Sequence, residues 1–228
     1  MSTKNIRPNV VFDLIDSGSD EFITAKIVIP NRYTYRGSPM ALEKLLLFSL
    51  MTYTKPKKIF EFGTYMGTTT RLFCDNTPPD TEIWTIDICN DFETVQNVSH
   101  ISTDVLELIE KSKSHSGIFI QDQPNINKLK SDSTKYNFSA LSGFDFIWID
   151  GGHDLDVVKS DTENAFKILS KSNPHAIIAW HDYRSNLYKE LTMYIDDLSK
   201  RHSIYWIEET MICFSCPNLD PYLKHTIA

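Results

Sequence analysis

Short apolar runs, each bounded by polar or turn-forming residues, recur along most of the chain. Four clear runs lie at residues 59–62, 82–87, 144–150 and 176–180, and a weaker run lies at residues 125–129. Their short length and their β-branched and aromatic side chains are typical of strands that are covered on both faces of a parallel sheet. We therefore expect five strands of this kind.

Amphipathic stretches separate these runs. The first helix is expected after Ser38 and Pro39, which suit the N-cap and the first helical position. Further helices are expected at residues 68–74, 103–113, 155–170 and 185–200. A hairpin is expected from residues 203–207 and 211–215. This alternation predicts an α/β fold with a doubly wound, mostly parallel seven-stranded sheet and a C-terminal antiparallel hairpin.

The first 37 residues carry few periodic signals. Residues 22–29 could form a strand or a short amphipathic segment, and residues 31–37 form an aromatic and basic loop. Residues 117–121 are also ambiguous, as a short strand or part of a connection. We expect residues 38–228 to form the main domain, with residues 1–37 as an N-terminal extension packed on it or as a lid.

Composition and charge narrow the class of protein. The 228 residues are 41% hydrophobic and 23% charged, as in globular domains. A net charge of −7 argues against a nucleic-acid partner, and no apolar run approaches the ~20 residues of a membrane span. Cys213 and Cys216 have C-x-x-C spacing but lack a second pair, so ordinary buried thiols are expected. Without a disulfide pattern or signal sequence, we expect a cytoplasmic protein.

The run at residues 59–62 leads into a glycine-bearing turn and then into a helix. Gly63 is expected to let the backbone approach a ligand, and Gly67 to bring the helix close to the strand. Thr68 suits the N-cap, which would direct N–H groups and the positive helix end into the turn. Glu61 is an acid in an apolar strand, where a charge costs free energy unless it binds something. The stretch predicts a small-molecule site.

Polar side chains follow every expected strand. These residues are Glu61, Asp87, Asp132, Asp150 with His153, and His181 with Asp182. In open α/β sheets, ligands bind beyond the carboxyl ends of the strands. Acids at the ends of consecutive strands therefore predict one shared site.

The glycine turn distinguishes between candidate ligands. A dinucleotide site would carry glycine at position 61, because a carboxylate there repels a pyrophosphate. The pattern Glu61-x-Gly63-x-x-x-Gly67, with Asp87 at the end of the second strand, resembles the class I S-adenosylmethionine-dependent methyltransferases. The sulfonium and ammonium groups of S-adenosylmethionine are cations, which suit a carboxylate-lined site.

This resemblance implies roles for individual residues. Asp87 would accept hydrogen bonds from the ribose hydroxyls, and Asp132 or Ser133 would contact the adenine edge. The residues that the resemblance assigns to the cofactor are Glu61, Gly63, Thr64, Tyr65, Gly67, Thr68, Asp87, Ile88, Asp132, Ser133 and Asp150.

The second half of the chain narrows the resemblance. The motifs I-D-G-G-H at residues 149–153 and W-H-D-Y at residues 180–183 resemble the metal-dependent branch of catechol-type and macrolide-sugar O-methyltransferases. The resemblance implies that Asp150 and Asp182 bind a divalent metal, with Mg²⁺ as the first candidate. His181 would be a further ligand, at a position where relatives often carry an acid. Because imidazole is softer than Mg²⁺ prefers, His181 leaves the identity of the metal open.

The same resemblance implies that His153 is the general base. A bound metal lowers the pKa of a hydroxyl and holds it in place, and a histidine can then take its proton. The expected reaction is methyl transfer to a hydroxyl of a small molecule or sugar. The aromatic residues Tyr33, Tyr35 and Tyr183 could stack on this acceptor.

Other interpretations stay open at this point. Asp150 could simply cap the following helix, His153 could be a helix-start residue, and Asp182 could be a turn residue. A nicotinamide-dependent oxidoreductase or a non-catalytic cofactor-binding domain could use a similar sheet. A serine nucleophile is disfavoured, since no G-x-S-x-G motif is present. The acceptor cannot be read from the sequence, and a homo-oligomer is possible.

Overall fold

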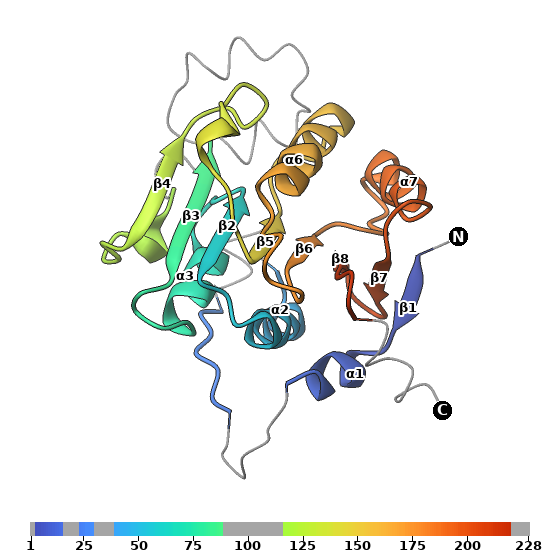
Figure 1. The fold of residues 1–228 in the computed structure, drawn as a ribbon, viewed down its shortest axis with the longest axis horizontal. Helices are drawn as coiled ribbons and strands as arrows, with labels where there is room; N and C mark the ends of the chain where they lie inside the picture. The colour runs from blue at the N-terminus through green and yellow to red at the C-terminus, as the bar shows by residue number, and fades with distance from the viewer. Residues whose placement is uncertain (1–2, 16–22, 30–38, 89–115, 220–228) are drawn as a thin grey trace.

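One sheet forms the centre of the fold in the computed structural model, which describes residues 3–15, 23–29, 39–88 and 116–219 (Figure 1). The strands are β1 (Lys4–Ile6), β2 (Lys58–Phe62), β3 (Glu82–Asp87), β4 (Ile126–Lys130), β5 (Phe146–Ile149), β6 (Ile177–Trp180), β7 (Ile204–Ile207) and β8 (Cys213–Ser215). The helices are α1 (Pro8–Asp13), α2 (Ala41–Thr54), α3 (Thr68–Asp75), α6 (Leu155–Ile168) and α7 (Lys189–Leu198), with 3-10 turns η1 (Ile118–Ile120) and η2 (Phe138–Ala140).

The order in which the chain adds strands to the sheet reverses at its centre, between β2 and β5. Eight strands follow the order β1-β7-β8-β6-β5-β2-β3-β4. Neighbours run parallel except at β8, which is antiparallel to both β6 and β7. From β2 the chain moves outward through β3 and β4, then returns to β5 on the other side of β2. Ligands of such sheets bind beyond the carboxyl ends of the strands at this point.

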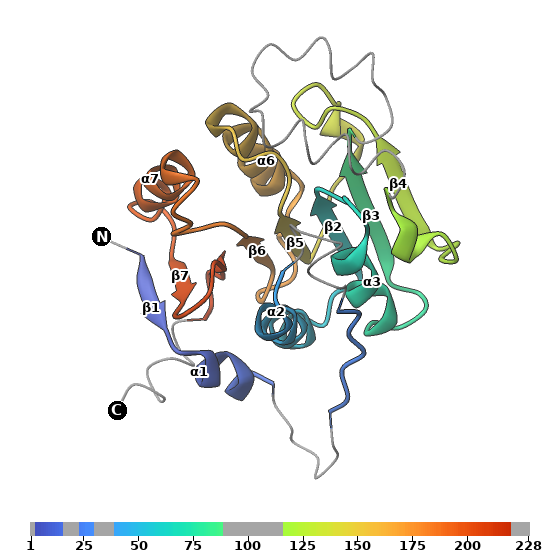
Figure 2. The same cartoon turned by 180° about the vertical axis from the view of Figure 1, so that it is seen from behind.

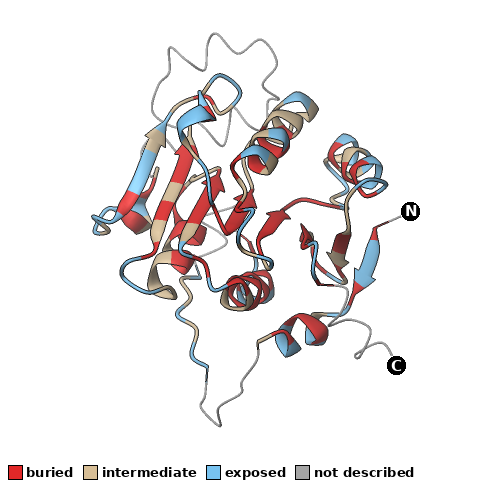
Figure 3. Cartoon of the chain, viewed as in Figure 1, coloured by how far each residue is buried: buried red, intermediate tan, exposed pale blue. Residues whose placement is uncertain are grey.

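Helices cover both faces of the sheet, as expected for a doubly wound fold. Apolar residues of α1, α2 and α3 share one core cluster, and those of α6 and α7 share another. The side chains of β2 alternate between the two clusters, with Ile59 in the first and Phe60 and Phe62 in the second. Figure 2 shows the sheet from behind, and Figure 3 shows that the central strands are buried while the edge strands β1 and β4 are partly exposed.

The number of strands is a correction to the sequence analysis, which predicted seven. The additional strand, β1, pairs in parallel with β7 at the edge of the sheet. It is followed by α1, whose Val10 and Val11 are buried in the core. A three-residue strand and a six-residue helix are too short to produce a recognisable hydrophobic period. Part of the expected N-terminal extension therefore belongs to the sheet and its core.

Most other expected elements are present with shifted ends. The start of α2 was predicted wrongly: the helix begins at Ala41, with Met40 as its N-cap, and Ser38 lies outside the described residues. The Glu43 side chain caps this end by accepting the Met40 N–H at 2.8 Å. The ambiguous residues 117–121 contain the 3-10 turn η1 rather than a strand. The helix expected at residues 103–113 and the aromatic loop at residues 31–37 lie outside the described residues.

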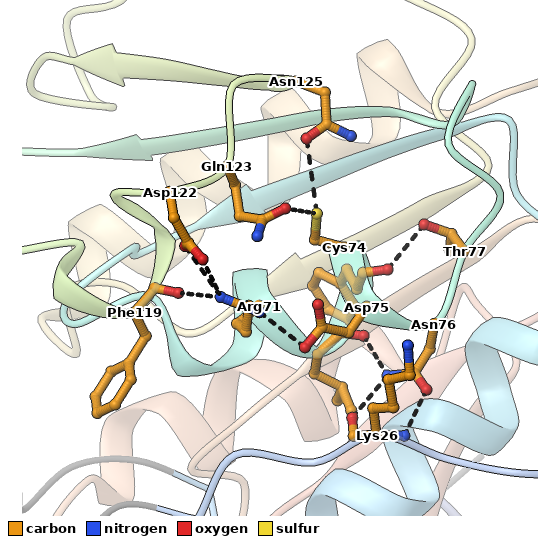
Figure 4. A network of polar contacts seen from close by, with 12 residues as sticks. Lys26, Arg71, Cys74, Asp75, Asn76, Thr77, Phe119, Asp122, Gln123 and Asn125 are labelled. Atoms are coloured by element: carbon orange, nitrogen blue, oxygen red, sulfur yellow. Dashed lines mark hydrogen bonds and ion pairs between the residues drawn. The ribbon is translucent and has the colours of Figure 1, made fainter.

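Side-chain hydrogen bonds fasten α3 to distant parts of the chain (Figure 4). Arg71 pairs with Asp75 in its own helix at 2.7 Å and with Asp122 beyond η1 at 3.0 Å. At the end of α3, the Asn76 amide accepts from the Lys26 N–H at 2.7 Å and donates to the Lys26 carbonyl at 2.8 Å. Residues 23–29 have no regular secondary structure. The two hydrogen bonds between Lys26 and Asn76 attach this segment to the end of α3. Among the described residues, no helix is long and apolar enough to cross a membrane.

Candidate active site

Glu61 is fully buried in β2 at the carboxyl edge of the sheet. Its Oε2 accepts hydrogen bonds from Thr70 of α3 and from Thr85 of β3, the latter at 2.7 Å. Its Oε1 has no hydrogen-bond partner among the described residues. Burial raises the pKa of Glu61 to about 8; the bonds from Thr70 and Thr85 oppose this, and the Asp150 and Asp87 carboxylates add to it. An unpaired buried oxygen is unfavourable, so this atom marks a place where a bound group would supply a donor.

The turn after β2 depends on two glycines with positive φ angles of 94° and 81°. A Cβ on Gly63 would lie 2.1 Å from the Asp150 carbonyl oxygen, so this glycine lets the end of β2 approach the end of β5. A Cβ on Gly67 would lie 2.9 Å from the Ile120 side chain, so this glycine makes room for η1. The sequence analysis had given other reasons for both glycines. It also placed the N-cap of α3 at Thr68 wrongly, since Gly67 occupies that position.

Asp87 and Thr64 attach this turn to β3. Asp87 Oδ2 accepts the Tyr65 N–H at 2.6 Å, which fixes Tyr65 in a left-handed conformation with φ of 44°. The hydroxyls of Thr64 and Thr85 are 2.6 Å apart, and Thr85 donates to Glu61. The predicted cofactor residues of the first half are thus brought together by one hydrogen-bond network, with Ile88 directly after Asp87.

The two residues expected to contact the adenine have different surroundings. Asp132 folds onto its own loop: Oδ1 accepts from the Thr134 N–H and hydroxyl at 2.9 and 2.7 Å, and Oδ2 lies 3.2 Å from Lys135 Nζ. Burial opposes ionisation of Asp132, but these contacts outweigh it and lower the pKa. The Ser133 side chain instead hydrogen-bonds Asp161 of α6. Asp132 therefore shapes the loop, and Ser133 joins it to the neighbouring helix.

Across the reversal point, β5 and β6 bring three further side chains together. One ligand atom from each of Asp150, His153 and Asp182 lies within 4.8 Å of the other two. Helix α6 begins only at Leu155, with Asp154 at the N-cap, so Asp150 does not cap this helix and His153 does not begin it. Asp182 follows β6 in a left-handed conformation with φ of 60°, which Asp tolerates better than most residues.

The orientation of the His153 ring is determined by two neighbours. Its Nε2 lies 2.8 Å from Asp182 Oδ2, and its ring is stacked on Tyr188, with centroids 3.9 Å and planes 2° apart. Burial opposes ionisation of Asp182, but hydrogen bonds with His153 and His181 outweigh it and lower the pKa. An ionised Asp182 favours the proton on Nε2, which leaves the lone pair on Nδ1. His153 Nδ1 is buried and has no hydrogen-bond partner among the described residues.

His181 is surrounded by acids. Its Nδ1 lies 3.4 Å from Asp150 Oδ1 and 3.3 Å from Asp182 Oδ2, and its Nε2 lies 3.4 Å from Glu43 Oε2. Burial opposes its charged form, but Asp150, Asp182 and Glu43 outweigh this and raise the pKa of His181 well above its usual value. His181 therefore offsets the charge of these acids. Its predicted role as a metal ligand stays a prediction, because the cluster of ligand atoms found in the described residues contains His153 instead.

The sequence analysis missed two residues of this site and misplaced one. Glu43 reaches the site from α2 and also accepts the Met211 N–H at 3.0 Å, so it joins α2 to the segment before β8. Tyr188 lies in the connection before α7, where no sequence pattern marks it. Tyr183, expected to stack on the acceptor, is a core residue: it is fully buried, and its hydroxyl donates to Asp196 at 2.7 Å and lies 2.9 Å from the Thr3 hydroxyl.

A comparison with protein families shows to which family the chain belongs. A family profile described as "Methyltransferase domain" matches residues 60–183, which is more than half of the chain. The chain belongs to this methyltransferase family. The matched segment contains both the glycine turn and the Asp150, His153 and Asp182 cluster of the methyltransferase. Membership of this family argues against the alternative that the protein is a nicotinamide-dependent oxidoreductase.

Solved structures share the fold of this methyltransferase. CalS11, a calicheamicin methyltransferase, has a TM-score of 0.53, with 13% identity over 92% of both chains. An O-methyltransferase from Bacillus cereus, solved with S-adenosylhomocysteine, has a TM-score of 0.51, with 14% identity over 92% of this chain and 99% of its own. TomG, an O-methyltransferase from Streptomyces achromogenes solved with S-adenosylmethionine, has a TM-score of 0.50, with 13% identity over 79% and 82%. At these identities the likeness concerns the fold alone. A search among curated protein sequences gives no match.

The methyltransferase site can be compared with the chemistry of the groups it is expected to bind. The unpaired Glu61 Oε1 suits the ammonium of S-adenosylmethionine, since a buried carboxylate oxygen gains most from a charged donor. Two carboxylates and an imidazole within 4.8 Å are donors that a divalent cation accepts. Both groups therefore fit the residues that are present.

Proposed function

We propose that the protein is an S-adenosylmethionine-dependent O-methyltransferase that acts on a hydroxyl of a small molecule or sugar. The observation that carries this proposal is the oriented His153, whose unpaired Nδ1 lies in the same site as the carboxylates of Asp150 and Asp182. A buried imidazole nitrogen with an available lone pair can remove a proton from a hydroxyl. CalS11, which shares the fold, is named as a TDP-rhamnose 3′-O-methyltransferase, and this supports a sugar among the candidate acceptors.

The methyl donor would lie along the carboxyl edge of β2 and β3. S-adenosylmethionine supplies a methyl group on a positively charged sulfur. Glu61 would accept the ammonium of its methionine part through Oε1, and Asp87 would accept the ribose hydroxyls. The turn from Gly63 to Gly67 would bring the backbone close to the ligand, and Ser133 would border the adenine.

His153 would act on the acceptor from the other side of the reversal point. Its Nδ1 takes the hydroxyl proton while the acceptor oxygen forms a bond to the methyl carbon and the carbon–sulfur bond breaks. The products are a methyl ether and S-adenosylhomocysteine, and the proton stays on His153. Asp182, at 2.8 Å from Nε2, would stabilise the resulting imidazolium. Holding the donor, the acceptor and the base in position would contribute to the rate enhancement of such a transfer.

A divalent metal would assist this step. Asp150 and Asp182 are the ligands we propose, with His181 as the further ligand implied by the resemblance. Mg²⁺ would suit the carboxylates, whereas an imidazole ligand would favour a softer metal. When bound, the metal lowers the pKa of the acceptor hydroxyl. If His153 Nε2 were itself a ligand, Nδ1 would carry the proton and could not act as the base.

Calorimetry with S-adenosylhomocysteine tests the proposed function directly. We expect binding to the wild-type protein and at least tenfold weaker binding to Asp87→Ala, since the ribose loses a charged acceptor. Methyl transfer is then measured with radiolabelled S-adenosylmethionine and a panel of catechols and nucleotide sugars. Absence of binding to the wild-type protein at millimolar ligand would overturn the proposal.

A further inference from the structure

Arg184 has a backbone conformation that its residue type disfavours. It lies in the loop that follows β6, and its φ angle is 63°. Glycine, asparagine and aspartate adopt left-handed angles most readily, whereas the Cβ of an arginine is crowded there. Asp182, two residues earlier, has a φ angle of 60°. Strain of this kind persists only where the surrounding structure enforces it, and it often accompanies a functional site.

The surrounding structure does enforce this conformation. Between the two left-handed residues, Tyr183 is fully buried, and its hydroxyl donates to Asp196 of α7 at 2.7 Å. The Tyr183 N–H donates to the Met211 carbonyl at 3.0 Å, in the segment before β8. The Arg184 N–H donates to the Thr192 hydroxyl of α7, also at 3.0 Å. The loop is therefore attached to α7 and to the segment before β8.

The Arg184 side chain adds an attachment to the sheet. Its guanidinium carbon lies 3.8 Å from the centroid of the Trp206 ring, although Arg184 itself is exposed. A guanidinium at this distance from an indole face is attracted by the ring electrons. Trp206 belongs to β7, and its indole N–H donates to the Thr210 carbonyl at 2.9 Å, so the ring itself is fixed.

The direction of the Asp182 carboxylate depends on this loop. Its Oδ2 lies 2.8 Å from His153 Nε2 and 3.3 Å from His181 Nδ1, so one oxygen atom contacts both rings. The φ angle sets the direction of the Cα–Cβ bond relative to the strand that precedes it. A return of Asp182 to the usual negative φ would therefore turn its carboxylate away from both rings.

We propose that Arg184 is a positioning residue: its stacking on Trp206 holds the left-handed loop, and the loop keeps the Asp182 carboxylate on His153. The effect on the reaction rate rests on the proposed function, in which His153 is the base. The contact between Asp182 and His153 is a property of the free protein, so it can be measured without a methyl donor or an acceptor.

Nuclear magnetic resonance of the free protein, labelled with ¹⁵N-histidine, tests this contact. The signal of His153 is identified by its absence from the spectrum of His153→Gln. We expect its Nε2 proton to give a downfield, slowly exchanging resonance in the wild-type protein, because a carboxylate accepts this proton. In Arg184→Ala the resonance should be lost to exchange with water, since the carboxylate is no longer held on the ring.

Kinetics and two further variants complete the test. Arg184→Ala should lower kcat at least about tenfold, because a displaced reacting group is costly, while binding of S-adenosylhomocysteine stays within about twofold. Arg184→Lys keeps a cation for the indole face and should retain the resonance and most of kcat. The matched control is Arg201→Ala, which removes an exposed arginine just after α7 and should behave like the wild-type protein.

The outcomes separate this inference from the proposed function. If folded Arg184→Ala keeps the His153 resonance, the inference is wrong, whatever the activity. If that variant loses the resonance but the wild-type protein binds no S-adenosylhomocysteine, the proposed function fails and the positioning role stands. If Arg184→Ala does not fold, Arg184→Gly replaces it, since glycine adopts a φ of 63° without strain. An unchanged resonance in folded Arg184→Gly would then overturn the inference.

Discussion

His153 lies flat against Tyr188, with ring centroids 3.9 Å apart and ring planes within 2° of each other. Asp182 contacts the edge of the same imidazole at Nε2. One neighbour thus fixes the plane of the ring and the other fixes its rotation within that plane. Three segments of the chain meet in this arrangement: the exit of β5, the exit of β6 and the connection before α7. Each of them can be tested separately.

Removal of the stacking partner should misalign His153, the proposed base. We expect Tyr188→Ala to lower kcat by about tenfold or more, because small displacements of a reacting group are costly. The KM for S-adenosylmethionine should stay within twofold, since Tyr188 stacks on His153 and not on the residues proposed for the cofactor. Tyr188→Phe retains the ring and should retain kcat. Initial rates with an acceptor from the panel measure this, and equal loss in both variants would contradict the stacking role.

Replacement of His153, the proposed base, should affect the chemical step and not cofactor binding. His153→Gln should lower kcat by about 10²–10⁴-fold, which is the usual contribution of general base catalysis. Binding of S-adenosylhomocysteine should be unchanged in calorimetry. The control is His202→Gln, since His202 stacks on Phe166 away from the site. A His153→Gln variant with near wild-type kcat would show that another group accepts the proton.

Metal dependence has its own prediction. Mg²⁺ or Mn²⁺ titrated into the protein should give a binding signal that Asp150→Asn abolishes, because a carboxylate ligand is lost. Asp156→Asn, on the exposed side of α6, should bind like the wild-type protein. Methyl transfer should fall after treatment with a chelator and recover on addition of metal. Activity that survives both the chelator and Asp150→Asn would remove the metal from the mechanism.

The close approach of β2 and β5 predicts unequal costs for two glycine substitutions. Gly63 and Gly143 both have positive φ, at 94° and 77°. A Cβ on Gly63 would overlap the Asp150 backbone, whereas one on Gly143 would meet nothing within 4 Å. Gly143→Ala should lower the free energy of unfolding by about 1–2 kcal/mol, the cost of the backbone conformation alone. Gly63→Ala should cost at least about 2 kcal/mol more, because backbone must also move. Urea denaturation measures both, and equal losses would argue against the close approach.

Glu61 predicts a pH dependence of stability. Its pKa is raised from 4.5 to about 8, so between these values the folded state binds more protons than the unfolded state. Its contribution to stability is therefore complete below pH 4.5 and is lost as the pH rises through 8. Relative to Glu61→Gln, the wild-type free energy of unfolding should fall by at least about 1 kcal/mol between pH 5 and pH 8. Urea denaturation at both values tests this, and a constant difference between the two proteins would contradict it.

The central part of the fold was predictable because its signals are local. The strand at residues 82–87 was predicted with its observed ends, since apolar β-branched and aromatic residues occur there without interruption. The weak candidate at residues 125–129 was also a strand, shifted by one residue to Ile126–Lys130. In contrast, β1 escaped prediction because it is held by pairing with β7 and not by its own composition. The start of α2 was misplaced because the Glu43 side chain, three residues after the N-cap Met40, caps it.

Some residues of the candidate site could also be predicted from local sequence, whereas contacts between distant residues could not. Acids at the ends of strands can be recognised in the sequence, so Glu61, Asp87 and Asp150 could be named as candidates from it. The contact of Glu43 with His181 was not predictable, because these two residues are 138 residues apart in the chain and share no local pattern. Tyr183 illustrates the opposite error, since an aromatic residue beside a site motif turned out to be a core residue.

By itself the sequence determined the alternation of strands and helices, the glycine turn and the presence of acids at the strand ends. These follow from backbone preferences and hydrophobic periods that act over a few residues. Only the tertiary structure decided which of those acids are paired, which oxygen or nitrogen atoms stay without a partner, and which aromatic ring lies on His153. Hydrogen bonding and burial depend on the distance between side chains from separate elements, and that distance exists only once the sheet has assembled.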